Sequence, residues 1–335
     1  MVDLGKLKFK IMELRNISFP PALGASGVQG FFGNPNFPEY KHSQIIRMLF
    51  GDIFKNMGFV AKTATTYANK GNVELSSNDY SFKKLLPNAI YPFISKGAAL
   101  NAVGLSNSGI DFLLETGIWH ERQKPFMLSF MPVGGTPLKN VKETEKFCMV
   151  LKQHLPFFKT KIALQVNLSC PNTNHDQGML LTEANTIFDI LGELDIPLVP
   201  KINALLNPKI AWEIMLHPKC DALCVSNTIP FGTHSDILWK KFGMKNGKSP
   251  LEKYNYPPGG LSGAPIFPIV VKWIEEFCKL KSYKPIIAGG GVMSKQDVRI
   301  LSDFSKVEAV SIGSVAFLRP WRVPGIIEEC YKWFL

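Results

Sequence analysis

The sequence predicts an α/β fold, a closed (β/α)8 TIM barrel, on three observations. Strand-like apolar runs alternate with helical patterns along most of the 335 residues. About eight such units fit this length, which favours a closed barrel over an open sheet. Polar residues end several strands, and barrels carry their sites at that edge, whereas an open sheet gathers its ligand residues at one switch point. We expect one domain, residues 1–335, with a short N-terminal extension and a long inserted loop near 230–260.

The individual elements follow from the spacing of apolar residues. Alternation of apolar and polar residues at 6–17 predicts a short hairpin outside the main fold. Apolar runs that end in small or polar residues predict strands at 21–27, 58–66, 125–131, 162–169, 197–203, 222–228, 285–292 and 308–314. Helical spacing predicts helices at 38–55, 108–117, 138–155, 182–194, 208–216, 265–280, 294–301 and 324–333.

Composition narrows the function classes. The chain has 38 Lys and Arg against 27 Asp and Glu, but the basic residues are scattered except at 239–253, so we expect no nucleic-acid partner. No apolar run approaches about 18 residues and the N-terminus has no signal-peptide pattern, so we expect no membrane partner. Six cysteines without a C-x-x-C pair indicate neither a metal site nor a disulfide scaffold. A reducing, cytoplasmic location is therefore expected.

Two glycine loops follow the last two predicted strands. Gly289-Gly290-Gly291 ends one strand, and Gly313-Ser314 ends the next. In these barrels that pair of loops binds phosphate through backbone N–H groups and a helix N-terminus. Ordinary turns are the alternative, but two such loops in order favour a phosphate site.

Two lysines end strands of the buried type. Lys62 and Lys201 occupy positions at which a charge is costly unless it meets an anion. A reduced flavin carries negative charge near N1 and O2, and a lysine at that edge stabilises it. The alternative is a lysine that extends from the strand end into solvent.

The stretch Gln165 to Asn172 carries the most distinctive chemistry. An apolar run enters it, and two amides, a hydroxyl and a thiol follow within a few residues. Cys170 is the one proton-transfer group expected at the rim of the barrel, with His175 and His234 in nearby loops as weaker alternatives. A buried structural cysteine is the competing interpretation.

Residues 167–172, Asn-Leu-Ser-Cys-Pro-Asn, resemble the active-site signature of class 1 dihydroorotate dehydrogenases, the FMN enzymes of pyrimidine synthesis. The resemblance extends over roughly residues 18 to 318 and includes Gly-Leu-Ser-Gly at 260–263 and the two glycine loops. It implies oxidation of dihydroorotate to orotate, in which a cysteine base removes the C5 proton and a hydride passes from C6 to flavin N5.

The resemblance also implies a role for each matching residue. Cys170 is the base. The substrate-binding residues are Lys62, Asn101, Gly104, Leu105, Asn167, Asn172, Asn227 and Thr228. The FMN-binding residues are Ala25, Ser26, Lys62, Asn167, Lys201, Gly263, Gly290, Gly291, Gly313 and Ser314. A homodimer and a soluble electron acceptor such as fumarate are expected, with no metal.

Two departures and two alternatives accompany this resemblance. Val103 replaces a frequent methionine, and Thr228 replaces a serine but keeps the hydroxyl. The loop at 230–260 is unusual in content and leaves the electron acceptor open. A related flavin enzyme acting on dihydropyrimidines or dihydrouridine is the alternative function, and a barrel that binds a phosphorylated ligand without redox chemistry is the third.

Overall fold

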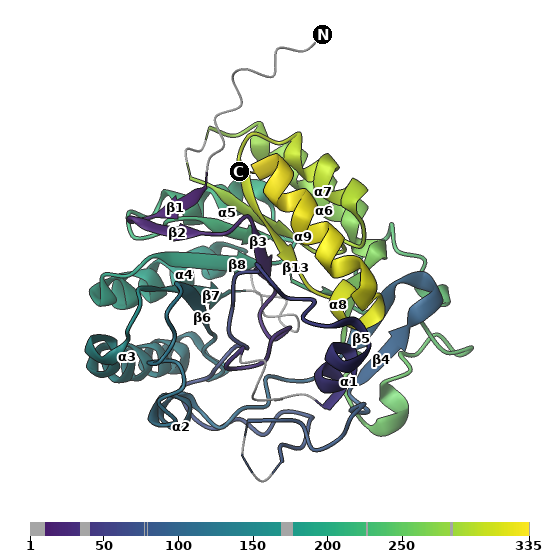
Figure 1. Cartoon of the computed structure of the whole chain (residues 1–335), viewed down its shortest axis with the longest axis horizontal. Coiled ribbons are helices and arrows are strands. Elements are labelled where there is room, and N and C mark those ends of the chain that lie inside the picture. Colours follow the sequence, from purple (N-terminus) through teal and green to yellow (C-terminus); the bar gives the residue numbers. More distant parts are fainter. Residues whose placement is uncertain are drawn as a thin grey trace.

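Seven parallel strands form one curled sheet in the computed structural model, which describes residues 11–33, 41–76, 78, 80–168, 177–225, 227–281 and 284–334. Their order is β3-β13-β12-β9-β8-β7-β6, and helices lie outside the sheet (Figure 1). The strands are β3 (Ala22–Gly24), β6 (Phe126–Phe130), β7 (Ile162–Asn167), β8 (Leu198–Ile202), β9 (Leu223–Val225), β12 (Ile286–Gly289) and β13 (Val307–Ile312).

Residues 58–64 close this sheet into a barrel. Leu23 of β3 makes a parallel bridge to Gly58, and on the other side Val60 makes a parallel bridge to Met127 of β6. The segment therefore occupies the eighth strand position, between the first and last strands of the curled sheet. The predicted (β/α)8 barrel is confirmed, although the predicted strand at 58–66 makes only isolated bridges.

The N-terminal half of the barrel interior is filled by one small cluster of apolar side chains. Successive side chains of a strand point to opposite faces, so alternate residues face the barrel axis. Each strand position contributes to the cluster: Leu23, Val60, Met127, Ala163, Val199, Cys224, Ile287 and Ala309. The residues that follow at the same spacing are polar on several strands, which places the site in the C-terminal half.

The predicted N-terminal hairpin consists of β1 (Met12–Leu14) and β2 (Ile17–Phe19). Arg15 and Asn16 form its turn with φ of 44° and 61°, as a two-residue type I′ turn requires. The inward apolar residues of both strands pack into the barrel-interior cluster. The expectation that the hairpin lies outside the main fold is therefore wrong, because its apolar face closes the N-terminal end of the barrel.

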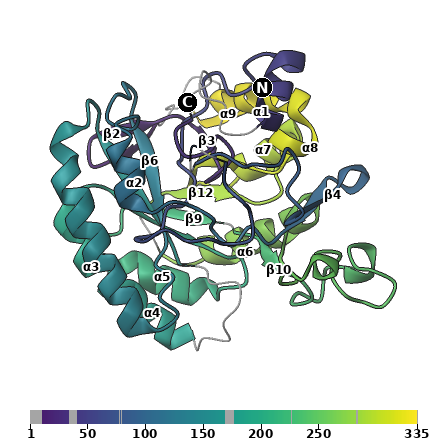
Figure 2. The same ribbon diagram turned by 90° about the horizontal axis from the view of Figure 1, so that it is seen from below.

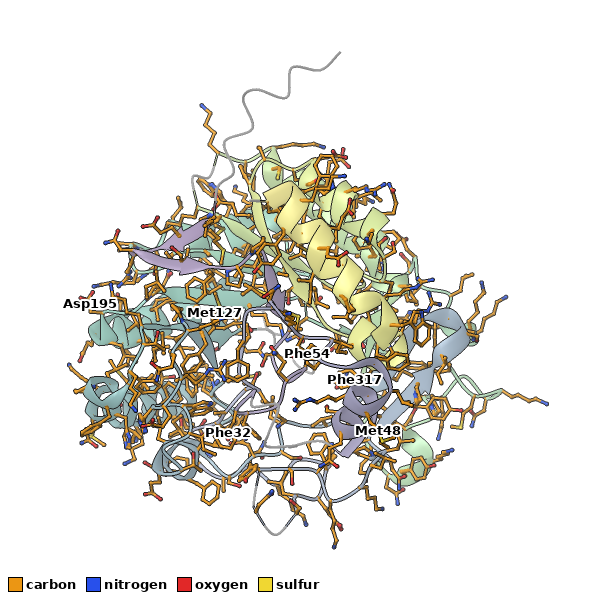
Figure 3. The ribbon with its side chains drawn as sticks, viewed as in Figure 1. Phe32, Met48, Phe54, Met127, Asp195 and Phe317 are labelled. Carbon is orange, nitrogen blue, oxygen red and sulfur yellow. The ribbon has the colours of Figure 1, made fainter. Side chains whose placement is uncertain are left out.

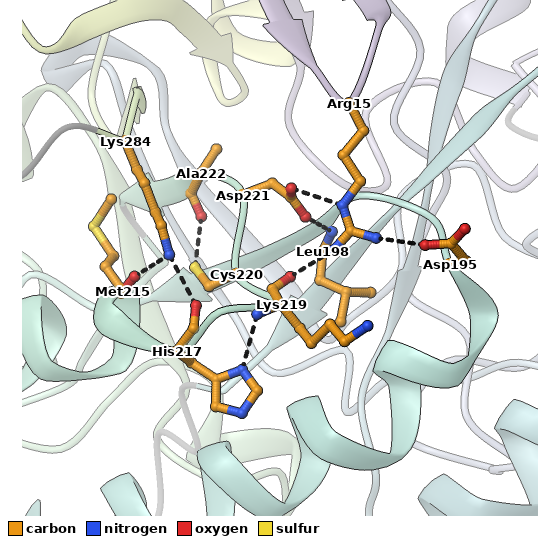
Figure 4. Close-up of polar contacts among 10 residues, drawn as sticks. All are labelled: Arg15, Asp195, Leu198, Met215, His217, Lys219, Cys220, Asp221, Ala222 and Lys284. Atoms are coloured by element: carbon orange, nitrogen blue, oxygen red, sulfur yellow. Dashed lines mark hydrogen bonds and ion pairs between the residues drawn. The ribbon is translucent and has the colours of Figure 1, made fainter.

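Arg15 holds the hairpin against the barrel wall (Figure 4). Its Nε donates to Asp221 Oδ1 at 2.8 Å, and its terminal nitrogens reach Asp195 and the Lys219 carbonyl. The other oxygen of Asp221 accepts from the Leu198 backbone N–H at 2.8 Å, at the start of β8. One carboxylate therefore joins the hairpin turn to a barrel strand.

Helices cover the outside of the barrel (Figure 1). Several begin at a residue whose side chain accepts a backbone N–H, as Thr136 does from Lys139 and Ser294 from Asp297. The helices around the barrel are α2 (Ile110–Glu115), α3 (Pro137–His154), α4 (Gln177–Leu191), α5 (Pro208–Leu216), α6 (Phe267–Cys278), α7 (Lys295–Ser302), α8 (Val315–Leu318) and α9 (Val323–Phe334). α8 was not predicted, and the others confirm the predicted helices to within a few residues at most ends.

A second, antiparallel sheet lies beside the barrel and was not predicted. Its order is β10-β11-β5-β4, and Figure 2 shows β4 and β10 on one side of the molecule. The predicted insertion is present, because residues 231–259 run between β10 and β11 with only short 3-10 turns. The strands are β4 (Ile90–Phe93), β5 (Ala98–Asn101), β10 (Ile229–Pro230) and β11 (Gly260–Gly263).

The helix predicted at 38–55 is shorter in the structure. It is α1 (Lys41–Phe50), within the loop that leaves β3 at the C-terminal end of the barrel. Ile46 packs against the core, and so does Ile53 beyond the helix end. Ile45 and Leu49, apolar residues of the same predicted pattern, are exposed instead.

The Arg15 contacts generate a stability prediction. Replacing Asp221 with Ala removes the acceptor of the Arg15 Nε and of the Leu198 N–H, so we expect a loss of about 1–3 kcal/mol in unfolding free energy. Asp195→Ala removes an exposed pair and should cost less than about 1 kcal/mol. Urea titrations of both variants measure this difference, and equal losses would show that the Asp221 contacts are not what secures the hairpin.

Candidate active site

Polar side chains gather where β7, β8 and β9 end. Asn167 lies opposite Lys201 in the parallel pairing, and Lys201 lies opposite Cys224. Asn227 follows β9, and its amide nitrogen donates to Asn167 Oδ1 at 3.0 Å. The structure therefore brings together three of the predicted site residues, Asn167, Lys201 and Asn227.

Lys201 is buried, and burial lowers its pKa. Cys224 beside it is no counter-ion at neutral pH, because burial raises the pKa of that thiol to about 11. Among the described residues, no hydrogen bond or ion pair reaches the Lys201 ammonium. A buried cation in this position is costly unless an anionic group comes to meet it, which fits the negative edge of a reduced flavin.

Three hydroxyls line the rim between β3 and β6. Ser26 Oγ donates to the Ala61 carbonyl at 2.8 Å and lies 2.9 Å from Thr63 Oγ1, which in turn lies 2.9 Å from Ser129 Oγ. Only Ser26 was predicted as a site residue. Ser129 lies two positions after Met127 of the interior cluster, and this spacing is the signal that it faces the barrel axis.

Gln165 is a further buried polar residue that the sequence analysis did not assign to the site. It lies two residues before Asn167, and its Oε1 is buried without a hydrogen-bond partner among the described residues. The i−2 spacing from Asn167 again identifies it as facing the barrel interior. An unmatched acceptor there adds to the polar character of the layer beneath the rim.

Lys62 lies on the opposite side of the rim. Its ammonium donates to the Ser106 carbonyl and lies 4.5 Å from the ring centroid of Phe31. The side chain is buried. The structure therefore ties Lys62 to the segment that carries Gly104 and Leu105.

That segment has an unusual backbone. Gly104 and Leu105 both have positive φ, 67° and 56°. The Asn69 side chain donates to both of their carbonyls, at 2.9 Å and 3.2 Å, and holds the turn in place. A leucine in the left-handed region is costly, which is typical of segments constrained by a site.

The second sheet positions the remaining predicted substrate residues. Asn101 of β5 is the pairing partner of Gly260, and a Cβ on Gly260 would lie 2.2 Å from Thr228 Oγ1. Asn101 and Thr228 therefore approach one another across a glycine. The Thr228 backbone is fixed on both sides, since its N–H donates to Asn227 Oδ1 and its carbonyl accepts from Asn203.

Close backbone packing requires glycine at two of the predicted cofactor positions, Gly263 and Gly291, but not at Gly313. A Cβ on Gly263 would lie 2.1 Å from the Gly97 carbonyl, and one on Gly291 would lie 2.7 Å from the Gly263 carbonyl, so packing alone requires both glycines. Gly290 has φ of 90°, whereas Gly313 has an ordinary φ and a Cβ there would meet only Ala25, at 3.3 Å. Because β12 and β13 are neighbours, both loops leave the barrel at the same edge.

Several candidates are not placed by the structure. Cys170, Asn172 and His175 lie outside the described residues. His234 belongs to the inserted loop, where its ring accepts the Asp236 N–H and its carbonyl accepts from Trp239. Within the described ranges no cluster of three or more His, Cys, Asp or Glu side chains is arranged for a metal ion. None of the described helices has the length and apolar character to cross a membrane.

The sequence model of one family, dihydroorotate dehydrogenase, matches residues 87–332. The chain therefore belongs to the dihydroorotate dehydrogenase family. Members of this family oxidise dihydroorotate in pyrimidine biosynthesis and are FMN-dependent flavoproteins. The buried Lys201, which has no ion-pair partner among the described residues, and the glycine loops fit that cofactor. The chain is accordingly an oxidoreductase of this type.

Curated relatives agree with this family. The chain is 30% identical to the catalytic subunit of the NAD(+)-type dihydroorotate dehydrogenase B of Geobacillus sp. (strain WCH70), over 70% of the chain and 69% of the relative. The corresponding protein of Anoxybacillus flavithermus is 28% identical over 69% of each. Dihydroorotate dehydrogenase A (fumarate) of Lactobacillus helveticus is 25% identical over 95% of the chain and 89% of the relative.

The burial of Lys201 predicts opposite effects on folding and on cofactor binding. Lys201→Met removes a buried cation that has no ion-pair partner in the described part of the chain. The FMN-free variant should therefore be more stable by about 1 kcal/mol at neutral pH, while its affinity for FMN falls. Denaturant titration of FMN-free protein and fluorescence titration with FMN measure the two effects. A destabilised FMN-free variant would contradict the prediction.

The same residue predicts a pH dependence. Because burial lowers the pKa of Lys201 in the folded state, the unfolded chain binds more protons between that value and about 10.4. The stability contribution of this residue in the FMN-free protein should therefore rise with pH through that window. Lys201→Met should lack this part of the rise, which a comparison of the two stability profiles tests.

Proposed function

We propose that this chain oxidises dihydroorotate to orotate with Cys170 as the base that removes the C5 proton. The observation that carries the proposal is the meeting of Asn167, Lys201 and Asn227 at the C-terminal ends of neighbouring barrel strands. Cys170 and Asn172 follow Asn167 closely in sequence and lie outside the described residues, so their roles rest on the signature that they share with the family.

In this proposal the carboxamides hold the dihydropyrimidine ring. Each carboxamide offers both donors and acceptors, which match the alternating N–H and carbonyl groups of the ring. The hydrogen bond from Asn227 to Asn167 fixes the orientation of both side chains. Asn101 and Thr228 reach the ring from the second sheet. The proposed substrate residues are Lys62, Asn101, Gly104, Leu105, Asn167, Asn172, Asn227 and Thr228.

Lys62 is proposed to meet the substrate carboxylate. Its ammonium is buried and donates to the Ser106 carbonyl, so a positive charge lies on this side of the rim. A carboxylate beside it forms a charge-assisted hydrogen bond, which is stronger than a neutral one. An uncharged dihydropyrimidine would leave that ammonium without its anion.

Bound FMN supplies the two-electron acceptor that takes the hydride from C6 of dihydroorotate. We propose that its phosphate lies at Gly290, Gly291, Gly313 and Ser314 and that Lys201 lies at its N1–O2 edge. Gly263 is retained as a proposed contact, although its glycine is already required by packing. Ala25, Ser26, Lys62 and Asn167 complete the proposed cofactor residues.

The electron acceptor, the assembly and the location are further parts of the proposal. The fumarate-type relative matches 95% of the chain, whereas the NAD(+)-type relatives match about 70% and are named as catalytic subunits. We therefore propose fumarate or another small soluble acceptor. A homodimer, a cytoplasmic location and a single barrel domain over residues 1–335 remain proposals from the resemblance.

The choice of substrate distinguishes this proposal from a dihydropyrimidine or dihydrouridine enzyme. Dihydroorotate should reduce the flavin at least about 10³-fold more efficiently than dihydrouracil, because a site built around an anion leaves its own polar groups unmatched when the anion is missing. Lys62→Ala should shrink this ratio through dihydroorotate alone, provided that FMN stays bound. Anaerobic stopped-flow bleaching measures both rates, and similar rates in the unaltered protein would favour the alternative enzyme.

The role of Cys170 is tested by its removal. Cys170→Ala should still bind FMN and orotate, but flavin reduction should slow by about 10²-fold or more, because the proton acceptor is lost. In the unaltered protein the bleaching rate should rise with pH as the thiolate forms. Near-normal bleaching by the alanine variant would assign the proton transfer to another group.

A further inference from the structure

The turn at residues 104–105 is held by a neighbouring loop, residues 65–73. The backbones of Asn69 and Asn107 exchange two hydrogen bonds, at 2.8 Å and 2.9 Å, and form an isolated antiparallel bridge. A Cβ on Gly71 would lie 2.7 Å from a carbonyl oxygen of the turn. Loop and turn therefore pack backbone against backbone, and the position of the turn depends on the loop.

The Asn69 side chain makes one contact that no other described residue duplicates. Its amide nitrogen donates to the Gly104 carbonyl at 2.9 Å and to the Leu105 carbonyl at 3.2 Å. The Leu105 carbonyl also accepts from the Asn107 side chain, at 2.6 Å. In the part of the chain that the structure describes, the Gly104 carbonyl accepts from Asn69 alone. Removal of the Asn69 amide would therefore release the peptide between Gly104 and Leu105 and leave the rest of the turn attached.

The orientation of that peptide decides where one backbone donor points. In a planar trans peptide the N–H points opposite to the carbonyl of the preceding residue. Because the Gly104 carbonyl is turned toward Asn69, the Leu105 N–H is directed away from Asn69. No acceptor among the described residues takes this N–H. A leucine with positive φ is strained, so the turn keeps this orientation only while its contacts hold it.

The same turn also locates the ammonium of Lys62. This group donates to the carbonyl of Ser106, the residue that follows the turn. It also lies 4.5 Å from the ring centroid of Phe31, in the loop after β3. Figure 3 labels Phe32, the next residue of that loop, below Met127 of the barrel interior. A displaced turn would move the carbonyl that binds the ammonium, and the positive charge would lose its fixed place.

We propose that Asn69 is a positioning residue that selects a substrate with a carboxylate. Its amide holds the turn so that the Leu105 N–H and the Lys62 ammonium keep fixed positions. The two oxygens of a carboxylate can accept from both donors at once. A dihydropyrimidine without a carboxylate would leave both donors unmatched. This role rests on the proposed function and adds to it a residue that does not itself touch the substrate.

The test compares two substrates in anaerobic stopped-flow bleaching of the FMN-loaded protein. In Asn69→Ala, the efficiency of bleaching by dihydroorotate should fall on the order of tenfold, the effect of one lost hydrogen bond, while that by dihydrouracil stays within about twofold. The loss should appear in the dihydroorotate concentration that gives half the maximal rate, because a contact with the carboxylate acts on binding. The Kd of orotate, measured from the flavin absorbance, should rise by a similar factor.

Thr66→Val is the matched control. Thr66 belongs to the same loop, but its hydroxyl donates to the Glu143 carbonyl of α3, at 2.8 Å, and not to the turn. This variant loosens the loop without freeing the turn, so it should keep the ratio of the two efficiencies. Asn69→His keeps one N–H donor at a similar distance from the backbone and should recover most of the efficiency with dihydroorotate. Flavin absorbance shows whether each variant still folds and binds FMN.

An unchanged ratio in Asn69→Ala would overturn the role of Asn69. So would an equal fall in Thr66→Val, because general loosening of the loop would then account for the effect. Equal losses with both substrates, or no recovery in Asn69→His, would assign Asn69 to folding instead. If dihydroorotate does not bleach the unaltered protein, the proposed function itself is wrong, and the role of Asn69 falls with it.

Discussion

The alternation of side chains along the barrel strands is the constraint on which the rest of this structure depends. Alternate residues face the axis, so each strand first contributes an apolar side chain to the interior and then, two residues later, one to the rim layer. On β7 the residues that face the axis are Ala163, Gln165 and Asn167, and on β8 they are Val199 and Lys201. A shift of one residue in any strand would remove its polar group from the site.

The barrel interior is apolar in its N-terminal half. Its N-terminal half is closed by the hairpin, whose apolar side chains pack into the barrel-interior cluster and keep water from that end. Arg15 and Asp221 hold the hairpin against the wall. With that end occupied by apolar side chains, the polar side chains of the interior, Lys201 among them, lie toward the C-terminal rim.

The sequence predicted the barrel, most helices and the placement of Asn167, Lys201 and Asn227, because long apolar runs followed by polar residues carry these features locally. It missed the antiparallel sheet, whose strands are short and rich in Gly and Pro, so neither alternation nor propensity marks them. It also missed Ser129, a single hydroxyl in an apolar strand, because only the register to its neighbours shows which face it takes.

The hairpin shows a different limit of sequence reasoning. Its alternation predicted the element correctly, but the partner for its apolar face is the open end of a barrel formed by residues from Leu23 to Ala309, and no local pattern records that contact.

The second sheet accounts for how distant segments join one site. Asn101 and Thr228 are far apart in sequence and follow different parts of the fold, yet both lie against Gly260, where any side chain would overlap Thr228 Oγ1. Gly263, three residues later on the same strand, packs on the Gly97 carbonyl and against Gly291 of the proposed phosphate loop. One four-residue strand thus contacts both the proposed substrate residues and the proposed cofactor loop. The inserted loop ends at β11, so a displacement of this loop would reach both halves of the site through the same backbone.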